Sequence, residues 1–245
     1  MKRCRLVIGS FLVFLLSATA LPAEERGKVT PWVKINEKDG IRVYSRDNSL
    51  VPLKECLATG VIDSSAANIE HLLRDWNAYK KIMFMSKKTE QADMPFCKES
   101  PDNYCAYLLQ GAPWPVEDRD GYGPISFYVH KPTNEILVKI TVRGSTMPLT
   151  KGVTRVPYCD MEWIIKPIDA THCQLTYQGL TVPGGNIDKI PPAIINWGMK
   201  FIGYYTMQNI RKLAKEERYQ HATAYITTTP WPEDMRFYAE EIPKS

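Results

Sequence analysis

Residues 190–220, IPPAIINWGMKFIGYYTMQNIRKLAKEERYQ, form the stretch that decides the fold. Pro191 and Pro192 suit the first turn of a helix, where a backbone N–H is not needed, and about 28 helical residues are predicted to follow. The two halves of this helix differ. From Gln208 onward the apolar residues form one stripe, whereas around Trp197 they go nearly all the way round. We therefore expect the first half to be covered on two sides.

Two arrangements would cover that half. It is either a core helix beneath a second layer, or it packs on a curved sheet with one side and lines an apolar ligand cavity with the other. We favour the second arrangement, because the rest of the chain supplies no obvious second layer. The apolar residues concerned are Ile194, Ile195, Trp197, Met199, Phe201, Ile202, Tyr204 and Tyr205.

The chain before this helix has the alternating pattern of strands. The stretch 64–82 differs, because it keeps apolar residues on one helical face and begins with Ser64 and Ser65 as candidate caps. A long antiparallel sheet interrupted by one helical stretch indicates an α+β fold and not a repeating βαβ unit. The predicted strands are 40–46, 54–63, 85–92, 103–111, 123–131, 135–144, 154–168 and 172–180.

The first twenty residues have the pattern of a secretory signal peptide. Lys2, Arg3 and Arg5 precede an apolar run of roughly 15 residues, which is shorter than a bilayer-spanning helix and ends in small residues. We expect cleavage after Ala20, with Ala23 as the alternative. The mature product is then a soluble exported protein, and in a bacterium its compartment is the periplasm.

Charge argues against nucleic acid as a partner. Residues 1–20 hold three of the 31 basic residues and none of the 27 acidic ones, so their removal lowers the net charge from +4 to +1. A near-neutral chain lacks the clustered basic face that phosphate binding needs. The remaining 225 or so residues are enough for one domain with a sizeable core, and no Gly/Ser-rich linker divides them.

Cysteines of the mature chain are expected to pair in an oxidising compartment. Cys97 and Cys105 enclose CKESPDNYC, whose Pro, Asp and Asn suit a hairpin loop, so we predict a disulfide between them. The count is odd, so one thiol stays free or links two chains, and the sequence leaves the pairing of Cys56, Cys159 and Cys173 open.

Four motifs in order resemble the START (steroidogenic acute regulatory protein-related lipid transfer) family, from about residue 40 to residue 217. They are GIRVYSR (40–46), WPVEDRD (114–120), RGSTMP with GVTRV (143–148 and 152–156), and VPGGNIDKIPPAIINW (182–197). The resemblance implies a helix-grip fold, in which a curved antiparallel sheet wraps around a long C-terminal helix and a tunnel between them holds one lipid. With residues 1–20 as the signal peptide, it implies residues 21–220 as the START-like lipid-binding domain and 221–245 as an extension.

The resemblance also suggests roles for the charged stretch after Pro113. In the family an Arg-Asp pair lies inside the framework, so we interpret Arg119 and Asp120 as structural, and Trp114 as a packing residue. One departure concerns the cavity: where some sterol-binding members bury a charged pair, this chain has Ala106 and Ile125. The sequence therefore does not indicate which lipid head group the cavity would recognise.

The sequence contains few motifs that would indicate catalysis, a metal site or a cofactor site. The four histidines are scattered, with no HExxH pattern, and no CxxC spacing, GxSxG elbow or phosphate loop occurs, so we expect no metal, cofactor or catalytic residue. Glu117, Asp118 and Asp120 are expected to be solvated turn carboxylates. The alternative is an enzyme of the helix-grip superfamily, a cyclase or hydrolase, with an ionisable residue in the tunnel. Its candidates are Asp160, Glu162 and Arg143, although alternation turns Met161 and Trp163 inward instead.

The sequence thus predicts a periplasmic lipid carrier without catalysis. Its gate is expected between Met147, Pro148 and Leu149 on one side and the helix start on the other, at Ile194, Trp197, Met199 and Phe201, with Ile202 and Tyr205 in the cavity. Expected partners are a lipid, transiently a membrane, and a membrane transporter if the aromatic tail 221–245 docks on one. Sterol, hopanoid, phospholipid and fatty acid all remain candidate cargoes.

Overall fold

The computed structural model describes residues 28–49, 51–95, 97–112, 116–143, 146–185 and 192–232. The predicted signal peptide and Trp114 lie outside these ranges. The strands are β1 Val33–Lys38, β2 Ile41–Asn48, β3 Val51–Ile62, β4 Ser86–Gln91, β5 Asn103–Gln110, β6 Asp118–His130, β7 Glu135–Arg143, β8 Val153–Arg155, β9 Tyr158–Pro167 and β10 Cys173–Val182. The helices are α1 Ala66–Arg74, α2 Tyr79–Ile82 and α3 Pro192–Leu213, with 3-10 turns at Trp76–Ala78 and Glu217–Tyr219.

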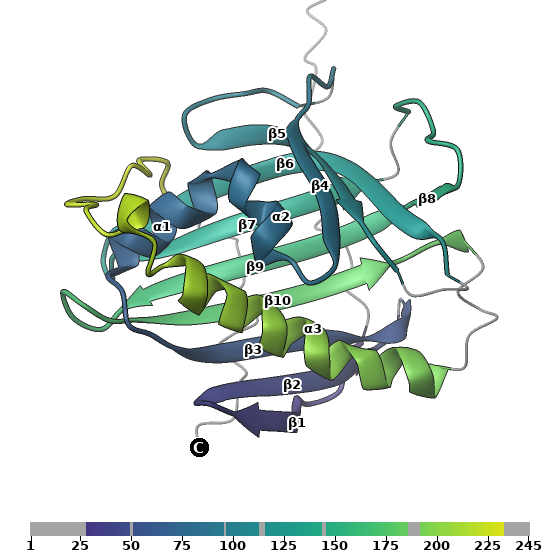
Figure 1. Ribbon diagram of the computed structural model, residues 1–245, viewed down its shortest axis with the longest axis horizontal. Helices are drawn as coiled ribbons and strands as arrows, with labels where there is room; N and C mark the ends of the chain where they lie inside the picture. The colour runs from purple at the N-terminus through teal and green to yellow at the C-terminus, as the bar shows by residue number, and fades with distance from the viewer. Residues whose placement is uncertain are drawn as a thin grey trace, which may run out of the picture.

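One curved sheet holds the described strands, in the order β1-β2-β3-β10-β9-β7-β6-β5-β4, and α3 crosses its inner face (Figure 1). Neighbouring strands on this path are antiparallel, while β8 pairs in parallel with the start of β6. The main apolar cluster joins alternate residues of the sheet to α1, α2 and α3. This is the helix-grip arrangement, so the predicted α+β fold class is confirmed.

Strands β6 and β7 approach each other closely at Gly121 and Gly123. A Cβ added to Gly123 would lie 1.8 Å from the carbonyl oxygen of Thr141, and one added to Gly121 would lie 2.8 Å from Val142. Glycine permits this close approach of two strands because it has no side chain. Pairing of β6 with β7 ends at Ile125, and the freed start of β6 pairs with β8 instead. The GYG sequence therefore allows the close approach of β6 to the end of β7.

Gly203 allows α3 to lie close to the sheet. A Cβ at this position would be 3.0 Å from that of Ala58 and 3.2 Å from Sγ of Cys56, both on β3. Farther along α3, Met207 and Ile210 are fully buried in the main cluster. The second half of α3 therefore rests on β2 and β3 as the predicted apolar stripe requires.

Several element boundaries differ from the sequence prediction. The stretch predicted as one strand, 154–168, is two strands, because the chain leaves the sheet at Val156 and Pro157. The helical stretch 64–82 breaks after α1, and α3 ends at Leu213, before the predicted end at residue 220. Strand β1 was not predicted; it lies at an exposed edge, and its apolar alternation is limited to Val33 and Ile35.

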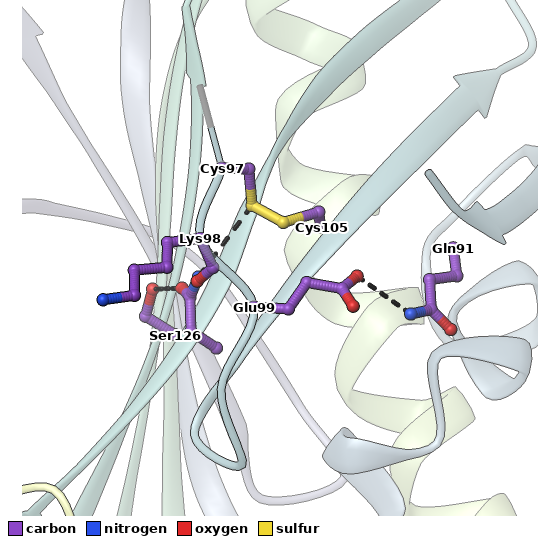
Figure 2. The surroundings of a disulfide bond; sticks show 7 residues. Gln91, Cys97, Lys98, Glu99, Cys105 and Ser126 are labelled. Carbon is purple, nitrogen blue, oxygen red and sulfur yellow. Dashed lines mark hydrogen bonds between the residues drawn. A yellow bond between two sulfur atoms is a disulfide. The ribbon is translucent and has the colours of Figure 1, made fainter. Parts of the chain in front are cut away.

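The predicted disulfide between Cys97 and Cys105 is confirmed, and it fixes the loop before β5. The two Cα atoms are 6.0 Å apart. Figure 2 shows the bond together with a hydrogen bond of 2.8 Å from Gln91 to Glu99, which ties the same loop to β4. Cys56, Cys159 and Cys173 are buried, and the last two are free thiols.

The first part of the C-terminal extension packs on the domain. Val129 of β6 donates its backbone N–H to Thr229, and Trp231 donates its own to Val129. These bonds use the edge of β6 beyond its pairing with β5, which ends at Ser126. Tyr225 also packs against the main cluster. Residues 221–232 are therefore bound to the same sheet as the core of the domain.

Candidate functional site

The inner face of the sheet is the candidate ligand surface. Apolar residues of seven strands point to this side, and α1, α2 and α3 face them. Ala106 and Ile125, the positions of the family's charged pair, are 1% exposed and belong to this apolar face. The face can therefore contact an apolar molecule without leaving an unpaired charge at these two positions.

The ionisable residues on which the enzyme alternative depends lie on the outer face. Asp160 and Glu162 alternate with Met161 and Trp163, which belong to the inner cluster. Asp160 accepts hydrogen bonds of 3.0 Å from Arg143 and 2.7 Å from the Tyr158 hydroxyl. Although burial opposes it, these bonds hold the pKa of Asp160 below its ordinary value. These side chains are thus part of an outer polar network.

The loop between β7 and β8 contains one half of the predicted gate. Pro148 is exposed, Met147 is half-buried, and Leu149 has 74% of its surface exposed. An apolar side chain this exposed gains nothing from the fold itself, whereas contact with a helix or a membrane would bury it. The side chain of Leu149 therefore has the exposure expected of a gate or membrane-contact residue.

Asp120 holds this loop through Arg155, and not through its sequence neighbour Arg119. Arg155 donates to Asp120 at 2.7 Å and to the carbonyl oxygens of Met147 and Pro148 at 3.1 and 3.0 Å. Asp120 is 2% exposed, so the expectation of a solvated turn carboxylate at this position was wrong. The hydrogen bond that Arg155 donates to Asp120 is the main cause that raises the pKa of Arg155. Arg119 instead donates to the carbonyl oxygen of Glu117.

We call this arrangement the loop latch: the carboxylate of Asp120, the guanidinium of Arg155 and the two loop carbonyls. The ring of Tyr122 lies under the guanidinium, 4.9 Å from it. Strand pairing between β6 and β8 brings Asp120 opposite Arg155, 35 residues later in the sequence. The sequence contains both residues in family-like motifs, but only the fold shows that they bind each other.

Helix α3 carries the other half of the predicted gate. The side chains of Ile194, Trp197 and Met199 lie outside the description, so their contact with the loop stays a prediction. Phe201 and Ile202 are half-buried. Tyr205 is 44% exposed and stacks on Phe84, which follows α2, with ring centroids 5.4 Å apart. Tyr205 thus joins α3 to the α2–β4 turn, whereas the sequence placed it in the cavity.

A buried ionic cluster closes the opposite end of β6. Arg74 donates to Glu70 at 2.9 Å and to Asp102 at 2.5 Å. Both carboxylates also accept backbone N–H groups of the extension, from Thr227 to Glu70 at 2.7 Å and from Thr229 to Asp102 at 2.8 Å. Although burial opposes it, these hydrogen bonds lower the pKa of Asp102 to about 2. We call this group the base cluster.

A surface pocket of about 660 Å³ lies at the C-terminal half of α3. Its charged lining includes Asp39, Asp63, Lys212 and Lys215, and Arg211 spans it by donating to the carbonyl oxygen of Val61 at 2.7 Å. This mixed polar lining does not suit an apolar ligand. The pocket is therefore not the candidate site.

The described residues hold no group of three metal-ligand side chains. Among the described helices, none combines the length and the hydrophobicity needed to span a bilayer.

Comparison with known proteins supports a START-like domain. No family model matches the sequence. An uncharacterized protein of Pseudomonas aeruginosa is 28% identical over 186 residues, which cover 73% of this chain and 86% of that protein.

Among solved structures, a STAR-related lipid transfer protein from Xanthomonas axonopodis has a TM-score of 0.66 and 27% identity, covering 76% of this chain and all of that one. Human STARD10 has a TM-score of 0.65 and 16% identity, covering 77% and 74%. An aromatase/cyclase from Streptomyces is also similar, with a TM-score of 0.45 and 16% identity, covering 69% and 98%.

Proposed function

Because the chain carries a START-like domain, we propose that it binds one hydrophobic ligand on the inner face of its sheet and transfers it between membranes, without catalysing a reaction. The observation that carries this proposal is the similarity to the bacterial lipid transfer protein, whose whole chain is covered at 27% identity. Sterol, hopanoid, phospholipid and fatty acid are the candidate ligands.

The apolar inner face supports a carrier energetically. Burial of apolar surface is favourable by about 25 cal/mol per Å², so a lipid held between the sheet and α3 is protected from water during transfer. The same gain opposes release, which is why a carrier needs a gate that opens at a membrane. The exposed Leu149 and the latch-bound loop around it suit that role.

The compartment is part of the proposal. Residues 1–20 have the features of a signal peptide, and the disulfide between Cys97 and Cys105 suits an oxidising compartment. We place the mature protein in the periplasm, where lipids exchanged between two membranes must cross an aqueous space. Transient membrane contact follows from this role.

A transfer assay tests the proposal. Donor vesicles containing a fluorescent phospholipid, sterol or fatty acid and a quencher are mixed with unlabelled acceptor vesicles, with and without the mature protein. The proposal predicts that the protein speeds the transfer of at least one probe in proportion to its concentration. If every probe moves at the spontaneous rate and none is retained by the protein after gel filtration, the proposal is wrong.

A further inference from the structure

Trp163 and Tyr177 stand side by side on the inner face of the sheet. They are directly paired residues of β9 and β10, and their ring centroids are 4.6 Å apart. Trp163 is fully buried, Tyr177 is 4% exposed, and both belong to the main apolar cluster. The two rings therefore bring an indole N–H and a phenol O–H into an otherwise apolar interior.

The indole N–H of Trp163 has no hydrogen-bond partner in the part of the chain that the structure describes. Buried indole groups usually find a partner, because an unpaired buried donor has lost its hydration without compensation. Indole nitrogen can only donate. This atom has no accessible surface, so neighbouring side chains must move before a ligand oxygen can accept its hydrogen bond.

The hydroxyl of Tyr177 extends along β10 over Gly179. A Cβ at Gly179 would lie 3.0 Å from this hydroxyl and 3.6 Å from Cγ of Met161, so glycine leaves the room that the phenol occupies. Burial raises the pKa of Tyr177 well above its ordinary value, and the Cys56 and Cys159 thiols add to the effect. The phenol is therefore neutral at physiological pH and can donate or accept a hydrogen bond.

The buried charged side chains form their ion pairs away from Trp163 and Tyr177. Glu70 and Arg74 are bonded to each other in the base cluster, and Asp160 belongs to the outer face. Helix α3, which packs on the inner face, contributes another buried hydroxyl, Oγ1 of Thr206, with no partner among the described residues. The interior thus offers neutral hydrogen-bonding groups rather than ions at this position.

We propose that Trp163 and Tyr177 form a recognition site for one uncharged oxygen, a hydroxyl or a carbonyl, on the bound hydrophobic ligand. This inference rests on the proposed function and narrows its ligand class. The oxygen accepts a hydrogen bond from Trp163, and a hydroxyl can also donate to Tyr177. A pure hydrocarbon leaves the indole unpaired, and a charged group would have no counter-ion beside it. The site therefore selects an oxygenated apolar molecule.

Paired ligands that differ in one hydroxyl test this site. The mature protein, freed of lipid, is offered 5α-cholestan-3β-ol against 5α-cholestane, and 1-hexadecanol against hexadecane, from vesicles, and the retained ligand is quantified after extraction. We expect a preference of about tenfold or more for the hydroxylated member of at least one pair, as for sites built around a hydrogen bond. Trp163→Phe and Tyr177→Phe should each reduce that preference.

Two outer-face variants serve as matched controls. Trp32→Phe removes another buried indole N–H without a described partner, and Tyr44→Phe removes another buried phenol hydroxyl. Both residues belong to a separate cluster on the other side of the sheet, so the preference should be unchanged. If Trp163→Phe fails to fold, Tyr177→Phe decides the question by itself.

The outcomes separate the two proposals. Equal retention of both members of each pair by the wild type, or an unchanged preference in the inner-face variants, overturns the recognition site and leaves the carrier function in place. Retention of no probe and of no vesicle phospholipid contradicts the carrier function as well.

Discussion

The two ends of β6 are held by ion pairs that differ in how many bonds support them. At the base cluster, Glu70, Arg74 and Asp102 bind one another or the extension through hydrogen bonds from both side chains and backbone. At the loop latch, one guanidinium, that of Arg155, connects Asp120 to two loop carbonyls. The comparison teaches that the same chemistry can fix one end of a sheet and leave the other dependent on a single side chain.

The largest expected effect comes from removing the central cation of the base cluster. Arg74→Met leaves Glu70 and Asp102 buried without their counter-charge, so the free energy of unfolding should fall by about 3–5 kcal/mol. Urea unfolding of the mature protein measures it. The control is Arg218→Met, whose ion pair with Asp75 is solvent-exposed and whose loss should change stability very little. If Arg74→Met lowers the free energy of unfolding as little as Arg218→Met does, the base cluster does not stabilise this end of β6.

A smaller loss of stability is expected from the loop latch. Asp120→Asn keeps the shape of the side chain but removes the charge that Arg155 faces, so the free energy of unfolding should fall by about 2–3 kcal/mol. Limited proteolysis should also cut the chain faster between residues 146 and 152. The matched control is Asp118→Asn, two residues earlier in the same strand, whose partner Lys87 is exposed. Unchanged cleavage in Asp120→Asn would break the proposed link between latch and loop.

The pH dependence of stability tests the base cluster again. Asp102 has its pKa lowered to about 2 from an ordinary value of 3.8. A lowered folded-state pKa stabilises the protein above the unfolded-state pKa, so this contribution, about 2 kcal/mol, should be lost as the pH falls from about 4 to about 2. Urea unfolding at several pH values measures the slope. Asp102→Asn should be less stable at pH 6 and should have a flatter slope; an identical slope would contradict the assignment.

The smallest effect on stability is expected at the gate. Leu149 is so exposed that Leu149→Asp should change the free energy of unfolding by less than about 0.5 kcal/mol. Lipid transfer should nevertheless slow several-fold, because a charge replaces the apolar contact with a membrane. Met147→Asp should act in the same direction. If both variants transfer lipid at the wild-type rate, the loop between β7 and β8 is not the gate.

The sequence predicts features that depend on neighbouring residues. Alternation predicts most strands and turns Met161 and Trp163 inward, and the composition of CKESPDNYC predicts the disulfide between Cys97 and Cys105. Each of these signals lies within one short segment, where spacing and residue type are sufficient.

Features that join distant segments could not be predicted. Asp120 meets Arg155 because β6 pairs with β8, and Asp102 meets Thr229 across 127 residues. Alternation turns Trp163 inward, but the register that pairs it with Tyr177 comes from the fold. The hydrogen bonds that an ion will make depend on these pairings and not on its local pattern.

The most direct test of the carrier account is native mass spectrometry of the mature protein exported to the periplasm of its own host, followed by extraction and identification of any bound molecule. The account predicts one stoichiometric hydrophobic ligand, and the recognition site further predicts that it carries a hydroxyl or carbonyl. A protein that is empty and also takes up no lipid from labelled vesicles would contradict the central claim.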